Sequence, residues 1–288
     1  MILADLAAAA ARAVGARAAS AEPVGGGSIN QAVRVTLDDG RRIFVKHHRD
    51  APPGSFRAEA EGLAWIAAAG ALRTPAVLAV VEEGDAPLLA LEWIERGPAA
   101  PGRGEEFGRA LAALHAAGAP SFGARDDGWI GPLPQPNGPC ETWAEFYAER
   151  RLMPLARRAV GARLLPASFL DDLERMRARL HGLAGPPEPP ARLHGDLWSG
   201  NAMLDAVGGP VVVDPAAYGG HREVDLAMMR LFGGFPAAAH AAYAEAAPLA
   251  PGHEERVGLW QLHPVLVHVC LFGGGYAAQA RELAARYL

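Results

Sequence analysis

The sequence contains almost no lysine and little cysteine. Of the 27 basic residues in the 288-residue chain, 26 are arginine, and Lys46 is the one lysine. Because lysine is a compact charge and arginine a wide planar fork, the position that kept lysine is a candidate for a site that needs the smaller group; chance survival is the alternative. Cys140 and Cys270 lie far apart without metal-ligand spacing, so neither a disulfide framework nor a zinc site is indicated. This usage favours a reducing, cytoplasmic location.

The chain also lacks runs of one charge and long apolar stretches. The net charge of -5 is spread over separated acids and bases, with no basic run that would follow a nucleic acid or an anionic membrane. No stretch approaches about 18 uninterrupted apolar residues. The alanine-rich N-terminus is interrupted by Asp5, Arg12 and Arg17, which favours an amphipathic helix over a signal peptide. We expect a small-molecule or protein-surface substrate, and neither nucleic acid nor membrane as a partner.

Residues 1–95 predict a small sheet with one helix packed on it. The runs AVRVTL and RRIFVKH alternate between apolar and polar positions and are joined by an Asp-Asp-Gly turn, which is typical of a β-hairpin. Residues 55–69 predict a helix, and VLAVVE and PLLALEWI predict two further strands. The segment 23–27 predicts a glycine turn.

The pattern becomes mainly helical after the Pro/Gly-rich link GPAAPGRG, which begins at Gly97. We expect helices at 104–117, 141–160 and 168–182, short strands around 202–204 and 211–213, and helices from there to the C-terminus. The 50% hydrophobic content suffices for a substantial core in one large domain or two lobes. The prediction is an α+β chain with an N-lobe at 1–95 and a C-lobe at 96–288.

The stretch LHGDLWSGN places His194, Asp196 and Asn201 in the pattern H-x-D-x-x-x-x-N. This is the spacing of the catalytic loop of protein kinases, in which the aspartate accepts a hydroxyl proton and the asparagine holds magnesium. Gly195 stands where those kinases have arginine. The pattern predicts Asp196 as the catalytic base and His194 as a hydrogen-bonding core group that orients the loop; a capped turn before a hairpin is the alternative.

A second carboxylate follows this loop. The apolar strand in PVVVDPAA delivers Asp214 to its C-terminal end, where a short hairpin would fold it back towards Asn201. Magnesium prefers about six oxygen ligands, usually one or two protein carboxylates with phosphates and water. We therefore predict Asn201 and Asp214 as magnesium ligands, whereas a lone aspartate at a strand end more often caps the next turn.

A glycine-rich turn near the N-terminus is a candidate phosphate cradle. VGGGSINQAVRV places Gly25, Gly26, Gly27 and Ser28 before a strand, and Asn30 stands where a kinase loop would have a third glycine. Asparagine tolerates left-handed backbone better than most residues. A glycine run alone is more often an ordinary turn. The pattern G-x-x-x-x-G-K-[ST] is absent, which argues against the P-loop NTPases.

Lys46 ends the strand RRIFVK, where the phosphate-binding lysine of a kinase-like lobe would lie. Such a lysine needs an acidic partner from the neighbouring helix, and Glu59 and Glu61 are the candidates. Glu59 shares a helical face with the apolar Phe56 and Leu63, whereas Glu61 lies on another face. We therefore predict the pair Lys46–Glu59; a solvent-exposed glutamate is the alternative.

Asp225 lies just before the apolar run LAMMRLF at the start of a predicted helix. Capping is the default role of an acid in the first turn of a helix. In kinase-like folds an aspartate at this point also braces the backbone of the catalytic loop. We expect this supporting role for Asp225, without direct chemistry.

With these residues in place, the sequence resembles the fructosamine kinase (ketosamine kinase) family, a branch of the protein-kinase-like fold close to the aminoglycoside and choline phosphotransferases. The shared motifs extend over most of the chain and include GGGSIN, FRAEAEGL, LHGDLWSGN, VVVDPAAYGGHREVDLAM, LFGGF and HPVLVHVCLFGGGY. LWSGN, YGGHRE and LFGGF are the most specific of them. Ser28 stands where members often carry cysteine, so we do not expect redox control through that loop.

The resemblance implies a bilobal α+β fold with a small antiparallel-sheet N-lobe and a mainly helical C-lobe. It implies transfer of the γ-phosphate of ATP, with Mg²⁺, to a sugar hydroxyl of a ketosamine, the adduct that forms when a sugar glycates an amine. The substrates would be ketosamines, free or on protein lysines. Because the phosphorylated product sheds its sugar, the implied role is deglycation. Bacterial relatives tend to favour ribulosamines and erythrulosamines over fructosamines.

The resemblance also extends the predicted site. Lys46, steadied by Glu59, would neutralise the phosphates of ATP under the glycine-rich turn. The adenine would bind the backbone of Glu92, Trp93 and Ile94 at the hinge after LLALEWI. Trp198, two residues beyond Asp196, can present a flat apolar face to the sugar or to the aliphatic stem of a glycated lysine; packing beneath the loop is the alternative.

Two other functions remain open from the sequence. The first is a small-molecule phosphotransferase of the aminoglycoside or choline kinase type, which would need a cluster of carboxylates to hold several ammonium groups. The chain has no dense acidic cluster, although Glu141, Glu145 and Glu149 could contribute. The second is a nucleotide-binding regulator without catalysis, which the presence of every predicted catalytic residue makes improbable.

Overall fold

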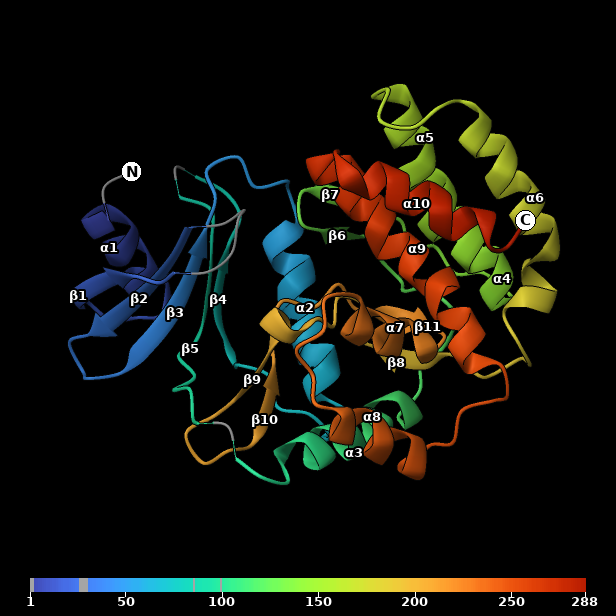
Figure 1. Cartoon of the computed structure of the whole chain (residues 1–288). Coiled ribbons are helices and arrows are strands. Elements are labelled where there is room, and N and C mark those ends of the chain that lie inside the picture. The colour runs from blue at the N-terminus through green and yellow to red at the C-terminus, as the bar shows by residue number, and fades with distance from the viewer. Residues whose placement is uncertain (1–2, 26–30, 85, 99) are drawn as a thin grey trace.

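A computed structural model describes residues 3–25, 31–84, 86–98 and 100–288 and shows two lobes (Figure 1). The N-lobe contains a five-stranded antiparallel sheet in the order β1-β2-β3-β5-β4. Its strands are β1 (Ala18–Pro23), β2 (Gln31–Leu37), β3 (Arg42–His47), β4 (Val77–Val81) and β5 (Leu88–Glu92). Its helices are α1 (Leu3–Ala13) and α2 (Ser55–Ala67).

The sheet of the N-lobe is covered by a helix on each face. Alternate residues of β5 point to opposite faces, as the period of a strand requires. Leu88 and Ala90 pack in one cluster with the buried side of α1. Leu89 and Leu91 pack in another with Phe56 of α2. Helix α2 therefore lies between the sheet and the C-lobe, where its side chains can reach both (Figure 1).

The predicted elements of the N-lobe are confirmed, with one omission. The hairpin, the helix after it, the two further strands and the N-terminal helix all form. Strand β1 was not predicted. It is an edge strand of composition AASAEP with no alternation of buried and exposed residues, so only its pairing with β2 defines it.

Within the described residues, the C-lobe consists mainly of helices around three short antiparallel strand pairs (Figure 1). Its helices are α3 (Arg103–Ala116), α4 (Trp143–Phe146), a π-helix (Tyr147–Leu152), α5 (Met153–Gly161), α6 (Ser168–Leu183), α7 (Glu223–Leu231), α8 (Ala237–Ala246), α9 (His253–Phe272) and α10 (Gly275–Ala285). Its strands pair as β6 (Gly128–Ile130) with β7 (Leu133–Gln135), β8 (Ala191–Leu193) with β11 (Tyr218–Gly220), and β9 (Ala202–Leu204) with β10 (Pro210–Val212). Within the described ranges, no helix is both long and apolar enough to cross a membrane.

The helix expected at 141–160 forms, but one turn of it is a π-helix, which is frequent near functional sites. This turn directs Arg151 into the core. Its guanidinium donates to the carbonyl of Pro136 at 2.6 Å and to Asn137 Oδ1 at 2.7 Å, and lies 3.8 Å from the ring centre of Tyr218. Because Tyr218 belongs to β11, which pairs with β8, Arg151 supports the strand pair from which the LHGDLWSGN loop starts.

A buried ion pair organises the core of the C-lobe. Arg256 of α9 donates to both carboxylate oxygens of Glu223 at 2.9 and 2.6 Å. Trp260, one turn further along α9, donates its indole N–H to the same carboxylate at 2.8 Å. All three side chains are buried. The carboxylate thus has the several partners that a buried charge requires.

We predict that Arg256→Ala lowers the free energy of unfolding by about 3–5 kcal/mol, because it leaves the Glu223 charge buried and without its cation. The matched control is Arg286→Ala, which removes an exposed pair with Glu282 and should cost at most about 1 kcal/mol. Urea unfolding of both variants measures the difference. Equal losses in the two variants would contradict the prediction.

The contribution of His263 to stability should fall as the pH decreases from 7 to 5. Burial lowers the pKa of His263 well below its ordinary value, and the charge of Arg151 lowers it further. Below a pH of about 6.5 the unfolded chain therefore binds a proton at this residue that the folded protein does not, which costs up to about 1.4 kcal/mol per pH unit. In His263→Gln the slope of the unfolding free energy against pH should decrease by about 1.4 kcal/mol per pH unit, which is the contribution of one proton. The exposed His181→Gln should keep the wild-type slope.

Candidate active site

The LHGDLWSGN segment forms a loop between β8 and the β9–β10 hairpin. Asn201 is buried at the end of a 3₁₀ turn, and its Nδ2 donates to the backbone carbonyl of Asp196 at 2.9 Å and to Asp196 Oδ2 at 3.1 Å. Asp214 follows β10 with a positive φ of 56°. Val213 donates its N–H to the carbonyl of Asn201 at 3.0 Å. The hairpin therefore brings Asp196, Asn201 and Asp214 together.

Asp225 holds the start of this loop. Its carboxylate is fully buried and accepts the N–H of His194 at 2.7 Å and the N–H of Gly195 at 2.9 Å. His115 Nε2 lies 3.2 Å away, and Nδ1 of the same ring lies 2.8 Å from the hydroxyl of Tyr243. Burial raises the pKa of Asp225, but His115, His194 and the N–H of Gly195 together lower it by more, so the net pKa lies below its ordinary value.

His194 orients the loop as a neutral ring. It is fully buried, and burial lowers its pKa. Its Nε2 lies 2.9 Å from the carbonyl of Val213, which can only accept, so Nε2 carries the proton. Nδ1 is then free to accept the N–H of Asp196 at 3.2 Å. The ring thus connects the strand end next to Asp214 with the backbone of Asp196.

Lys46 reaches this loop from the N-lobe. It is buried on β3, and its Nζ donates to Glu59 Oε1 at 2.7 Å and to Asp214 Oδ1. Burial lowers the pKa of Lys46, but the charges of Glu59 and Asp214 raise it by more, so the ammonium stays charged. Glu61 is exposed, as its helical face predicts. Of the two glutamates, Glu59 is therefore the one that pairs with Lys46.

Asp196 lies in an environment that disfavours its charge. Its side chain is half-buried, and burial together with the charge of Asp214 raises its pKa to about 7. The hydrogen bond from Asn201 acts in the opposite direction. A carboxylate with a pKa near 7 is matched to accepting a proton at neutral pH.

Trp198 lies over the loop rather than beneath it. Its indole covers Gly200 so closely that a Cβ atom on Gly200 would lie 2.2 Å from the ring. Its edge meets Phe232 at a centroid distance of 6.2 Å, and the side chain is 39% exposed. Gly234 packs on Ser199, where an added Cβ would lie 2.4 Å from the hydroxyl. The motifs LWSGN and LFGGF are therefore in contact, and each needs its glycine for this packing.

The predicted adenine hinge is held by residues that were not predicted as part of the site. Glu92 accepts from Arg73 at 2.6 Å, and the other arm of Arg73 binds Asp205 in the β9–β10 turn at 2.5 Å. Trp93 lies beneath the guanidinium of Arg34, 5.3 Å from its ring centre, and Ile94 is buried. Because Arg73 and Asp205 are separated by 132 residues, no local pattern could reveal their pairing.

Part of the predicted phosphate cradle cannot be placed. Gly26, Gly27 and Ser28 lie outside the described residues, and Gly25 is exposed just after β1. No group of three or more His, Cys, Asp or Glu side chains within the described residues could hold a metal ion. A cation at this site would therefore depend on the mixed amide and carboxylate pair Asn201 and Asp214, as expected for magnesium, which keeps phosphate and water ligands.

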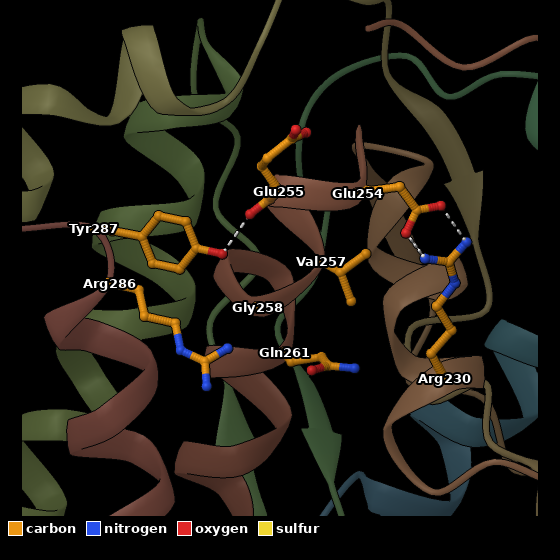
Figure 2. A pocket seen from close by; sticks show the side chains of 8 residues that line it. All are labelled: Arg230, Glu254, Glu255, Val257, Gly258, Gln261, Arg286 and Tyr287. Atoms are coloured by element: carbon orange, nitrogen blue, oxygen red, sulfur yellow. Dashed lines mark hydrogen bonds and ion pairs between the residues drawn. The ribbon is translucent and has the colours of Figure 1, made fainter. Parts of the chain in front are cut away.

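A separate surface pocket of about 460 Å³ is formed by α7, α9 and the C-terminal residues (Figure 2). Its polar side chains are largely bound to one another or to backbone. Arg230 pairs with Glu254, and the hydroxyl of Tyr287 donates to the carbonyl of Glu255 at 2.6 Å (Figure 2). None of its lining residues belongs to the site around Asp196.

The two lobes form a bilobal protein-kinase-like fold. The aminoglycoside phosphotransferase APH(4)-Ia shares this fold, with a TM-score of 0.60, 17% identity and 94% of each chain covered. The match to the fructosamine kinase family model extends over residues 4–288. The chain belongs to the fructosamine kinase family and is an ATP-dependent kinase.

Relatives and solved structures agree with this membership. A probable ketoamine kinase of Synechocystis is 41% identical over 90% of this chain and 87% of its own. The chloroplastic protein-ribulosamine 3-kinase of Arabidopsis thaliana is 36% identical over 92% of this chain and 81% of its own. The crystal structure of a candidate fructosamine-3-kinase from Thermobifida fusca is 44% identical, with a TM-score of 0.91 and 99% of each chain covered.

We predict that Asp225→Asn lowers turnover by about 10²-fold and the free energy of unfolding by about 2–3 kcal/mol. The amide cannot accept both loop N–H groups as a charged carboxylate does, and the loop that carries Asp196 would shift. Steady-state kinetics and urea unfolding measure the two effects. The exposed Asp171→Asn on α6 is the matched control and should change neither. Wild-type turnover in Asp225→Asn would contradict the supporting role.

Proposed function

We propose that this protein is an ATP-dependent ketosamine kinase that phosphorylates a sugar hydroxyl of a glycated amine. The observation that carries the proposal is that Asp196, Asn201, Asp214 and Lys46 meet at one point in a chain of the fructosamine kinase family. The names of the Synechocystis and Arabidopsis relatives support ketosamines as the substrate class. Loss of the sugar from the phosphorylated product would restore the amine, so the role is deglycation.

In this proposal Asp196 is the general base. Its raised pKa and its place beside Asn201 suit a group that takes the proton of the attacking sugar hydroxyl. General acid–base groups contribute roughly 10²-fold to 10⁴-fold to turnover. His194 and Asp225 would position the loop through its backbone.

The residues around Asp214 fit a magnesium ion bound with the nucleotide. The Nδ2 of Asn201 donates hydrogen bonds to Asp196, so the amide oxygen Oδ1 is the atom that would ligate the cation. Asp214 would supply a carboxylate oxygen. When bound, the ion supplies positive charge that offsets the negative charge of the transferring phosphoryl group. Asn201 and Asp214 would thus give two of its ligands and leave the others to phosphate and water.

ATP would lie between an N-lobe at 1–95 and a C-lobe at 96–288. Lys46, held by Glu59, would neutralise the phosphates, and the turn from Gly25 to Ser28 would cover them. The adenine would bind the backbone at Glu92, Trp93 and Ile94, a segment that Arg73 ties to the C-lobe. The Lys46 ammonium bridges the two lobes, which supports a role for it on phosphates bound between them.

The acceptor side of the proposed site is apolar rather than acidic. Trp198 offers an exposed indole two residues from Asp196, which suits a sugar ring or the stem of a glycated lysine. Of the three glutamates that could hold an aminoglycoside, Glu149 is paired with Arg177 at 3.0 Å. We therefore prefer ribulosamines, erythrulosamines or fructosamines, free or on protein lysines. Both cysteines are unpaired, which fits a cytoplasmic enzyme.

The test is ATP consumption with ribulose-lysine, fructose-lysine and kanamycin as acceptors. The wild type should consume ATP with a ketosamine, and Asp196→Asn should lower that turnover by roughly 10²-fold to 10⁴-fold. The exposed Asp171→Asn should match the wild type. Activity with kanamycin alone would reject the ketosamine assignment. Near-normal turnover in a folded Asp196→Asn would reject the base.

A further inference from the structure

An aromatic track leads away from the proposed base. It consists of five side chains in successive ring contact, Trp198, Phe232, His268, Phe272 and Tyr276. Trp198 meets Phe232 at 6.2 Å, and Phe232 meets His268 at 5.0 Å between centroids. His268 in turn lies 5.5 Å from Phe272 and 4.9 Å from Tyr276.

Three elements of the C-lobe hold the track. Phe232 ends α7, His268 and Phe272 lie in the last turns of α9, and Tyr276 lies in the first turn of α10. The Nδ1 of His268 donates to the carbonyl of Pro264 at 2.8 Å, which fixes its ring between its neighbours. Helix α10 begins on the side of the C-lobe nearer the N-lobe and runs towards the C-terminus on the far side (Figure 1).

The track has exposed side chains, whereas most large apolar side chains of the described residues are buried. Phe232 is 42% exposed and Phe272 is 56% exposed, comparable with Trp198 at the start of the track. An exposed apolar surface that is continuous with a catalytic loop is typical of a binding surface rather than of ordinary packing. The five side chains include no carboxylate, lysine or arginine, so the surface suits apolar groups better than a polycationic amine.

The length of the track exceeds what a sugar requires. The sugar hydroxyl must lie at Asp196, and the aliphatic stem of a glycated lysine can extend over Trp198. The contacts beyond Phe232 lie further out, where the carrier of the ketosamine would continue. Aromatic side chains bury large apolar areas and therefore contribute strongly to recognition of such a carrier.

We propose that the aromatic track binds the peptide around a glycated lysine and selects segments in which apolar or aromatic residues flank that lysine. This inference rests on the proposed ketosamine kinase function and names the preferred carrier of its substrate. Recognition begins at Trp198 with the lysine stem and ends at Phe272 and Tyr276 with the flanking side chains.

The test compares kcat/KM for three ribulosylated acceptors. They are N-acetyl-lysine, a five-residue peptide with leucine and phenylalanine around the modified lysine, and the same peptide with glycine and serine instead. The wild type should prefer the apolar peptide by about 10-fold over the other two, the effect of burying part of one or two aromatic rings. Phe272→Ala should reduce this preference to less than about 3-fold. It should change kcat/KM for ribulosylated N-acetyl-lysine little.

Two further variants keep the test decisive. Phe272→Tyr retains the ring and should keep the preference, and Val207→Ala removes an exposed apolar side chain outside the track and should behave as wild type. Thermal unfolding checks that each variant is folded.

Equal kcat/KM for the three acceptors in the wild type would overturn the track proposal and leave the ketosamine kinase function intact. An equal decrease of kcat/KM for all three acceptors in Phe272→Ala would also overturn the track proposal and leave the kinase function intact. If sedimentation shows that Phe272→Ala converts a dimer to a monomer, the track is an interface between copies and the proposal also fails. Absence of activity with every ketosamine would overturn the proposed function and the track with it.

Discussion

A single buried ammonium connects the two lobes of this protein. Lys46 lies between the carboxylates of Glu59 and Asp214, which are 13 and 168 residues away in the sequence. A buried charge is costly unless it is paired, so the position of the sheet relative to the C-lobe is coupled to these contacts. Asp214 also raises the pKa of Asp196, which links the charge state of the proposed base to the same cluster.

Helix α7 provides the second constraint, because its first turn carries two buried carboxylates with different partners. Glu223 points into the core, where Arg256 and Trp260 bind it. Asp225 points to the proposed catalytic loop and accepts the backbone N–H groups of His194 and Gly195. Residues two apart on a helix face different sides, so one turn of α7 ties the loop to the core.

The motifs LWSGN and LFGGF meet at the proposed catalytic loop. The indole of Trp198 lies over Gly200 and touches Phe232, and Gly234 packs on Ser199. In the proposed function the aspartate and asparagine of the loop serve phosphotransfer. The tryptophan and the segment behind it would form the surface that distinguishes the acceptor.

Much of this protein could be predicted from the sequence because short-range patterns determine it. The hairpin that carries Lys46, the helical face of Glu59 and the spacing of Asp196 and Asn201 all follow from local periodicity, and the family follows from its motifs. Strand β1 could not be predicted, since its residues lack alternation and only its pairing defines it.

Only the tertiary structure decided which distant residues meet. The contacts of Arg73 with Asp205, of Arg151 with Tyr218 and the succession of rings from Trp198 to Tyr276 join segments that no local pattern relates. The sequence by itself determined the elements and the chemical groups they carry, because period and spacing act within one element. Which side chains each of these groups contacts depends on how the two lobes, and helices α7, α9 and α10, pack together. Burial and ion pairing join residues that are far apart in the chain, so these contacts follow only from the tertiary structure.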